Sequence, residues 1–309
     1  MRQGIWVRLF DLHCDTPSYC FRHGCSVRHH DGAVDLHRGK CFSPWNQAFA
    51  AFLPDGLEPT EARRLCTNLV DTVCGWEQES DFRLIRHRMD LDDALTGCRG
   101  LLTVENGGAI GEEFSFLDYL ARRGVRVMGL TWNGKNCWAS GCMAGDDGLS
   151  SVGCQAISHI ERLDITVDVS HLNETCFWQV VRQCTKPIIA SHSNASSVCA
   201  HPRNLSDEQF CAIRDGGGVV GLNLYAPHLG NGDVLLNFRR HLEHFLSLNG
   251  EHCICIGSDL DGMNIPSDWN GMNILRKLWK FLQTAGYPDS LLEDIFYNNA
   301  HNFFYRVLN

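Results

Sequence analysis

The sequence predicts an α/β fold, a (β/α)₈ TIM-type barrel, and two observations carry this prediction. Short β-branched or apolar runs alternate with longer amphipathic stretches along the whole chain, as in repeated βα units around parallel strands. We count eight such runs, which is the number of strands in this barrel. The expected strands are 8–14, 47–53, 100–105, 125–131, 165–170, 187–191, 218–224 and 253–258.

Helices are expected between these strands. The stretch 59–89 begins with Pro59, which suits a first helical turn, and its apolar residues recur at helical spacing. The other helical stretches that we single out are 113–123, 174–184 and 206–215. Ser206 can cap the last of these helices, and the three glycines at 216–218 can end it and turn the chain into the next strand.

The remaining segments predict loops and one domain. Residues 17–44 and 225–233 are rich in Gly, His and Pro, so we expect irregular loops over the mouth of the barrel. No repeat or linker divides the chain. We therefore expect a single domain over 1–309, with a terminal helix at 289–308 packing on the outside.

Composition excludes several partners. The 36 acidic and 27 basic residues give a net charge of -9, which disfavours nucleic acid. The first ten residues contain Arg8 and no sustained apolar run, and no stretch is apolar enough to cross a bilayer, so we expect a cytoplasmic protein without membrane contact. The even count of 16 cysteines invites a disulfide interpretation, but without an export signal we expect small buried thiols in a reducing compartment.

The end of the first strand carries a possible metal-binding pair. His13 and Asp15 are two residues apart, so in an extended chain they point to the same side and can hold one metal ion. A helix cap or a polar loop is the simpler interpretation of this pair alone. However, His171 and His192 also follow apolar strands, at the rim where barrel enzymes gather their catalytic groups. Neutral imidazole is a common zinc ligand, so these residues together favour a metal centre.

Two carboxylates are expected to be catalytic. Glu105 closes the third strand, and its two oxygens could bridge two cations; an interaction with the nearby helix N-terminus is the alternative. Asp259 ends the eighth strand and could act as general base and then general acid, with Asp261 as the competing candidate. Arg203 offers a fork of donors for a substrate carboxylate, although a surface salt bridge would explain it equally well.

At these residues the chain resembles the renal or membrane dipeptidase family of zinc peptidases. The likeness covers nearly the whole length and is most specific in "ASHSNASSVCAHPRN" at 190–204, followed by "GGGVVGLNLY". Other matching stretches are 11–16, 100–110, 168–171 and 256–262. The resemblance implies a (β/α)₈ barrel and two zinc ions. It implies that His13, Asp15 and Glu105 bind one zinc, that Glu105, His171 and His192 bind the other, that Arg203 binds the dipeptide carboxylate and that Asp259 handles the proton.

One position departs from the family pattern. Better-known members place a His after the Thr that closes the fourth strand, where it helps to hold the substrate. Here Thr131 is followed by Trp132 and Asn133. An indole N–H can donate one hydrogen bond but cannot become a cation, so we expect Trp132 and either Asn133 or Asn136 to contact the substrate instead.

The sequence thus leads to a hypothesis with two rivals. Two zinc ions, or Mn²⁺ or Co²⁺ on the same donors, share a hydroxide that attacks the peptide bond of a dipeptide with a free C-terminal carboxylate. Another binuclear metal-dependent hydrolase, cleaving a lactone, cyclic amide or phosphoester, is the first rival. A relative that binds metal and peptide without cleavage is the second, and Trp132 is its only support. A homodimer is one option for assembly.

Overall fold

The protein is described by a computed structural model that covers residues 7–92, 96–264 and 266–309. Residues 1–6, which make up most of the N-terminal stretch searched for an export signal, therefore lie outside the described residues. Each of the predicted strands overlaps a strand of the structure. The strands are β1 Val7–Asp11, β2 Phe42–Phe52, β3 Phe82–Leu84, β4 Cys98–Glu105, β5 Val125–Gly129, β6 Thr166–Asp168, β7 Ile189–Ala190, β8 Val219–Leu222 and β9 Ile254–Ile256.

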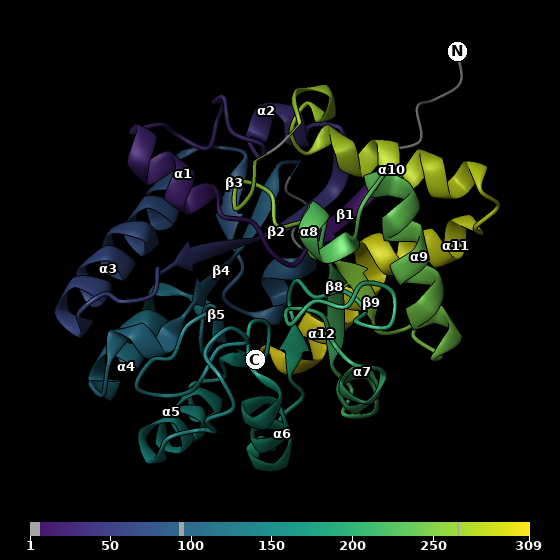
Figure 1. The fold of residues 1–309 in the computed structure, drawn as a ribbon. Helices are drawn as coiled ribbons and strands as arrows, with labels where there is room; N and C mark the ends of the chain where they lie inside the picture. Colours follow the sequence, from purple (N-terminus) through teal and green to yellow (C-terminus); the bar gives the residue numbers. More distant parts are fainter. Residues whose placement is uncertain (1–6, 93–95, 265) are drawn as a thin grey trace.

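Eight of these strands form a closed parallel barrel. Their order is β2-β1-β9-β8-β7-β6-β5-β4, and β4 pairs with β2 to close the ring, while β3 adds to the side of β4. Apolar side chains such as Phe10, Leu101 and Ile189 fill the inside. Helices surround the strands (Figure 1). The predicted (β/α)₈ barrel is confirmed.

The helices lie between and after the strands. They are α1 Thr16–His23, α2 Leu36–Gly39, α3 Pro59–Gly75, α4 Phe114–Arg123, α5 Ser151–Arg162, α6 Glu174–Gln183, α7 Asp207–Asp215, α8 Ala226–Leu229, α9 Val234–Ser247, α10 Asn273–Thr284, α11 Asp289–Glu293 and α12 Asn299–Val307. The predicted cap of α7 is confirmed, because the Ser206 hydroxyl accepts from the backbone N–H of Gln209 in a capping box. Gly217 follows this helix with a φ of 74°, a conformation that favours glycine.

The helix predicted over 59–89 is too long. It ends at Gly75, and after a 3₁₀ turn at Trp76–Gln78 the chain forms β3. In β3 the buried Phe82 and Leu84 flank the exposed Arg83, a period of two that fits a strand and not a helix. The short length of β3 hid this pattern.

The loops predicted at 17–44 and 225–233 are only partly irregular. The first contains α1 and α2, and β2 already begins at Phe42 instead of near residue 47. Pro44, the last residue of the predicted loop, lies within β2, where the pairing with β1 is irregular. The second loop contains α8, whose first turn includes Pro227.

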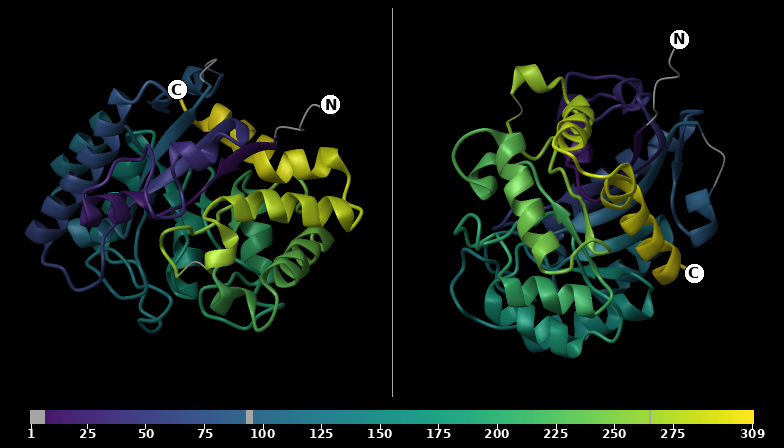
Figure 2. Two further views of the ribbon diagram at one scale, coloured as in Figure 1. Left: turned by 90° about the horizontal axis from the view of Figure 1, so that it is seen from above. Right: turned by 90° about the vertical axis from the view of Figure 1, so that its right-hand side faces the viewer.

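The terminal helix covers one end of the barrel from outside the ring of strands. α11 and α12 are joined by a π-helical turn at Asp294–Asn298. Arg306 donates to the carbonyl of Gly217 and Asn299 to that of Glu251, just before β8 and β9 begin. Their side chains therefore mark the amino-terminal end of the strands. In Figure 1, α12 lies behind β8 and β9, and the right-hand view of Figure 2 shows it on the far side from the green loops.

Within the described part of the chain, no helix combines the length and the apolar character needed to span a membrane.

Candidate functional site

The five predicted metal ligands all follow the carboxyl ends of barrel strands. His13 and Asp15 come after β1, Glu105 is the last residue of β4, His171 follows β6 and His192 follows β7. Parallel strands bring such residues to one rim of the barrel. All five are buried, each less than 10% exposed. The rim therefore holds a group of ionisable side chains that water does not reach freely.

Glu105 lies at the centre of this group. One carboxylate oxygen, Oε1, is 2.8 Å from Nε2 of His171 and 3.8 Å from Nε2 of His192. The other, Oε2, is 3.5 Å from Nε2 of His13, which is 3.4 Å from Oδ2 of Asp15. The five residues thus form two sets that share Glu105, and within each set the potential ligand atoms lie within 4.8 Å of one another.

The donor atoms fit divalent cations. Nε2 of His13 and Oδ1 of Asp15 are buried without a hydrogen-bond partner, which costs free energy unless another group satisfies them. Burial opposes charge on His13, but Asp15 and Glu105 raise its pKa well above the usual value, so positive charge is favoured here. Mixed imidazole nitrogen and carboxylate oxygen ligands suit zinc and its neighbours. The residues present therefore fit a metal centre.

Asp259 faces the same group of side chains. Its Oδ1 lies 4.0 Å from Nε2 of His13, and its backbone has a φ of 64°. Burial, together with the charges of Asp15 and Glu105, raises the pKa of Asp259 to about 7 despite the opposing effect of His13. A carboxyl group that titrates near neutrality can both accept and release a proton.

Both side-chain oxygens of Asp261, the competing candidate, are used in hydrogen bonds within the fold. Its Oδ1 accepts from the N–H of Ala33 at 2.6 Å, and its Oδ2 accepts from the Thr16 hydroxyl at 2.7 Å. These bonds tie the start of α1 and the loop after it to the barrel rim. Although Asp261 also borders the cavity, its oxygens are occupied, so Asp259 is the better placed carboxylate.

A cavity of about 640 Å³ opens beside this group. Its lining includes Asp15, Glu105, His171 and Asp259 together with Arg203, and an apolar part from α3 and the neighbouring loops. The apolar and aromatic lining residues are Phe21, Phe52, Pro54, Leu65, Leu69, Trp132, Met143, Tyr225 and Pro227. Such a mixture suits a small ligand with both charged and apolar parts.

Arg203 is buried at the cavity, which excludes the surface salt bridge considered above. One terminal nitrogen donates to the Ser193 hydroxyl at 3.2 Å and the other to the His192 carbonyl at 2.8 Å. These bonds fix the guanidinium plane, while Nε has no partner. Burial lowers the pKa of Arg203. A buried cation with unused N–H groups is suited to binding a carboxylate.

The three residues around the departure from the family pattern have different surroundings. Trp132 lines the cavity and meets the ring of Phe52 edge-on, with the ring centroids 5.1 Å apart. Asn133 also lines the cavity, and its Oδ1 is 3.0 Å from Nδ1 of His171. Asn136 bonds to Asn106, the Leu130 carbonyl and the backbone of 138–139, so its amide is used within the fold. Of the two asparagines, only Asn133 can reach a ligand.

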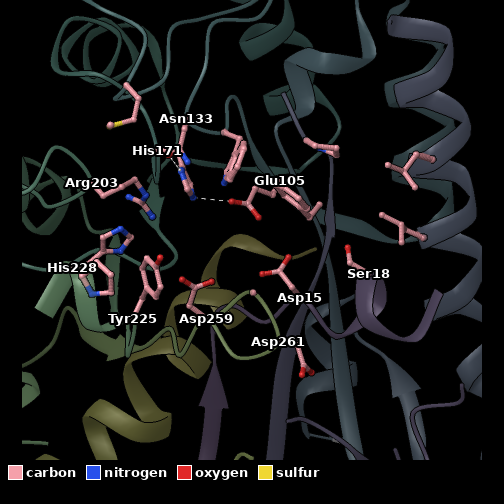
Figure 3. Close-up of a pocket in the computed structure, with 18 of the residues that line it drawn as sticks. Asp15, Ser18, Glu105, Asn133, His171, Arg203, Tyr225, His228, Asp259 and Asp261 are labelled. Atoms are coloured by element: carbon pink, nitrogen blue, oxygen red, sulfur yellow. Dashed lines mark hydrogen bonds and ion pairs between the residues drawn. The ribbon is translucent and has the colours of Figure 1, made fainter. Parts of the chain in front are cut away.

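Sequence reasoning missed two cavity residues and two supporting ones. Tyr225 and His228 lie on the same side of the cavity as Arg203, where Figure 3 also shows His171 directed at Glu105. Both missed residues belong to 225–233, which was expected over the mouth but given no role. Asp168 and Ser191 stand next to predicted ligands and hydrogen-bond each other at 2.5 Å. Their place at the ends of adjacent strands was the available signal.

Comparisons with known proteins give a consistent result. The family model described as "Membrane dipeptidase (Peptidase family M19)" matches residues 6–308. An uncharacterized protein in the pqqA 5' region of Klebsiella pneumoniae is 34% identical over 209 residues, covering 63% of this chain and 77% of that protein.

Two solved structures share the fold over its full extent. One is a metallopeptidase from Rhodobacter sphaeroides, liganded with a phosphinate mimic of the dipeptide L-Ala-D-Ala. It has a TM-score of 0.89 and 24% identity, with 98% of this chain and 99% of that chain covered. The other is described as dipeptidase AC, a metallopeptidase, with the same TM-score, 25% identity and the same coverage.

Proposed function

Since this chain belongs to the membrane dipeptidase family, Peptidase family M19, we propose that it is a metal-dependent dipeptidase that cleaves dipeptides with a free C-terminal carboxylate. The observation that carries the proposal is the position of Glu105 between His13 and His171, beside a cavity that also contains the buried Arg203. The R. sphaeroides metallopeptidase, which has the same fold, is liganded with a phosphinate mimic of a dipeptide, and this supports the substrate class.

The proposed metal centre consists of two zinc ions. His13, Asp15 and Glu105 would hold one, and Glu105, His171 and His192 the other, with Mn²⁺ or Co²⁺ as alternatives. When bound, such ions polarise a carbonyl group and lower the pKa of water. The buried atoms without partners on His13 and Asp15 support this assignment.

The chain's own residues would supply the remaining steps. Arg203 binds the C-terminal carboxylate and so places the scissile bond near Glu105. Asp259, which lies 4.0 Å from His13 at the edge of this group of ligands, accepts a proton from the attacking water and passes it to the departing amine. Trp132 and Phe52 form an apolar wall for a substrate side chain, and the indole N–H can donate one hydrogen bond.

A dipeptide panel with metal analysis tests the proposal. The purified protein is stripped with a chelator and reloaded with Zn²⁺, Mn²⁺ or Co²⁺, and bound metal is counted by mass spectrometry. We expect two ions per chain and cleavage of free dipeptides, with much slower cleavage of their C-terminal amides. Glu105→Gln serves as the inactive control. Binding of dipeptides without turnover, or turnover only of a lactone, cyclic amide or phosphoester, would refute the dipeptidase assignment.

A further inference from the structure

Behind the candidate metal ligands, two imidazole rings are bonded through the nitrogen that faces away from Glu105. Nδ1 of His192 is 2.7 Å from the Ser191 hydroxyl oxygen, and that hydroxyl is 2.5 Å from Oδ2 of Asp168. Nδ1 of His171 is 3.0 Å from the amide oxygen of Asn133. All of these atoms except those of Asn133 belong to buried residues. The other nitrogen of each ring, Nε2, is directed at Glu105.

The chain of hydrogen bonds from Asp168 fixes the proton on His192. Oδ1 of Asp168 accepts from the backbone N–H groups of Ser170 and Ser191 at 2.9 and 3.0 Å, so this carboxylate acts only as an acceptor. The single proton of the Ser191 hydroxyl therefore points to Asp168. The hydroxyl oxygen must then accept at its short contact with His192, so Nδ1 of His192 carries the proton and Nε2 keeps a lone pair.

The same logic applies to His171. The amide oxygen of Asn133 can only accept, so Nδ1 of His171 donates and Nε2 again keeps its lone pair. His171 also has a φ of 70°, a left-handed conformation that costs a non-glycine residue free energy and needs support from its surroundings. The bond to Asn133 supplies part of that support by fixing the direction of the ring.

These assignments leave acceptors facing acceptors. Nε2 of His171 and Nε2 of His192 are 2.9 Å apart, and the first is 2.8 Å from Oε1 of Glu105. With both protons on the far side of the rings, no proton lies between these three atoms. Only a cation relieves the repulsion among them.

We propose that Asn133, and Asp168 acting through Ser191, are positioning residues that fix the tautomers of His171 and His192 and so present both Nε2 lone pairs to a divalent cation. This inference rests on the proposed metal centre. It assigns Asn133 a place behind a ligand, whereas the sequence suggested a substrate contact. The residues act on the cation through the two histidines and are not themselves metal ligands.

Metal affinity gives the first test. Zn²⁺ and Co²⁺ binding to the chelator-stripped protein is measured by competition with a chromophoric chelator. Ser191→Ala and Asn133→Leu should each weaken binding about 10- to 100-fold, while Asn133→Asp, which keeps an acceptor, should retain most of the affinity. Ser170→Ala is the matched control. The Ser170 hydroxyl is buried beside these groups, lies 3.4 Å from the Ser191 hydroxyl oxygen and accepts from the His192 backbone N–H, but it does not contact the ring, and the shorter Ser191–Asp168 bond does not depend on it. This control should change affinity by less than about threefold.

Imidazole ¹⁵N chemical shifts in the chelator-stripped protein give the second test, because without a metal on Nε2 the tautomer depends on the groups bonded to Nδ1. We expect His171 and His192 to be protonated at Nδ1 in the wild type, and His192 to lose this fixed tautomer in Ser191→Ala. Protonation of either ring at Nε2, or unchanged affinity and shifts in both Ser191→Ala and Asn133→Leu, would overturn the inference. A wild-type protein that binds no divalent cation would instead overturn the proposed function. Thermal unfolding of the metal-free variants identifies any that fail to fold.

Discussion

The two ends of the barrel use the same strands for opposite purposes. At the amino-terminal end, Phe10 of β1 stacks on Phe304 of α12 with ring centroids 5.3 Å apart, and both side chains are fully buried among apolar neighbours. At the carboxyl end, three residues beyond Phe10, His13 enters a buried cluster of carboxylates and imidazoles. His171 and Asp259 have positive φ values there, which cost free energy. Apolar packing and ionisable groups thus lie at opposite ends of the barrel. The apolar packing offsets the free energy that the buried ionisable groups and the positive φ values cost.

The largest expected effect is on turnover, from a change at the carboxyl end. Asp259→Asn removes the group proposed to move the proton but keeps its size. We expect kcat to fall by a factor of about 10² to 10⁴, with the metal content and the unfolding temperature nearly unchanged. Steady-state kinetics on a free dipeptide, with metal analysis of the same sample, measures this. Wild-type turnover in Asp259→Asn would remove Asp259 from the mechanism.

Asp261→Asn makes the contrast with Asp259 sharper. Both carboxylate oxygens of Asp261 are acceptors, one from Thr16 and one from the backbone of Ala33. The asparagine of the variant has only one such oxygen, so it would disturb the loop after α1 and reduce stability. A fall in kcat as large as that of Asp259→Asn, without a loss of stability, would exchange the roles of the two carboxylates.

A change at the amino-terminal end should show the opposite pattern. Phe304→Ala leaves a cavity beside Phe10 and should lower the free energy of unfolding by about 3–5 kcal/mol, while kcat of the folded fraction stays at the wild-type value. Chemical denaturation of the metal-free protein measures the loss. Tyr305→Ala is the matched control on the same helix, because Tyr305 is 41% exposed. A large loss of kcat in folded Phe304→Ala would show that the two ends are not independent.

How far the sequence predicts this molecule also differs between regions. The strand ends were predictable, because a polar residue after an apolar run in a βα unit must lie at the rim; His13, Glu105, His171 and His192 follow this rule. Glu105 was further constrained by alternation, since Leu101, whose side chain packs inside the barrel, lies four residues before it on the same strand. The fold itself followed from eight such runs.

What sequence could not predict depends on contacts between distant segments. Asn133 and His171 are 38 residues apart, and their bond depends on the path of the loop after β5 and on the left-handed backbone of His171. The strand β3 was missed because three residues give too short a pattern to compete with a preceding helix. Asp261 could be named from the sequence only as a competing carboxylate, because its partners Thr16 and Ala33 are known only from the folded chain.

A smaller effect is expected at the proposed carboxylate anchor. Arg203→Lys keeps the charge but loses the planar fork, so kcat/KM for a free dipeptide should fall about 10- to 100-fold, as expected for one hydrogen bond to a charged group. Amidation of the substrate removes the same interaction from the other side. We therefore expect the wild type to lose rate on amidation and Arg203→Lys to lose much less. Equal losses in the two proteins would show that Arg203 does not bind the carboxylate.

The smallest expected effect concerns an ion pair remote from the metal site. Arg86 donates to both carboxylate oxygens of Glu77, at 2.8 and 2.6 Å, in the segment before and after β3. The hydrogen bonds from Arg86, opposed by burial, lower the pKa of Glu77 from its ordinary value of 4.5. A carboxyl group whose pKa is lower in the folded state stabilises the fold above its unfolded pKa, and this contribution is lost as the pH falls through the folded value.

Glu77→Gln should therefore destabilise the protein by less than about 1 kcal/mol at pH 7, because the pair is partly exposed to solvent. The difference from the wild type should shrink as the pH falls below 4.5. Urea denaturation of both chelator-treated proteins between about pH 3 and pH 7 measures it, and the chelator keeps metal release at the other end of the barrel out of the comparison. A difference that stayed constant or grew in acid would mean that the pair stabilises the fold by shape or packing and not by charge. Neither Glu77 nor Arg86 is a proposed metal ligand or lines the cavity. Glu77→Gln should therefore leave metal affinity unchanged, which extends the separation between the two ends from apolar packing to electrostatics.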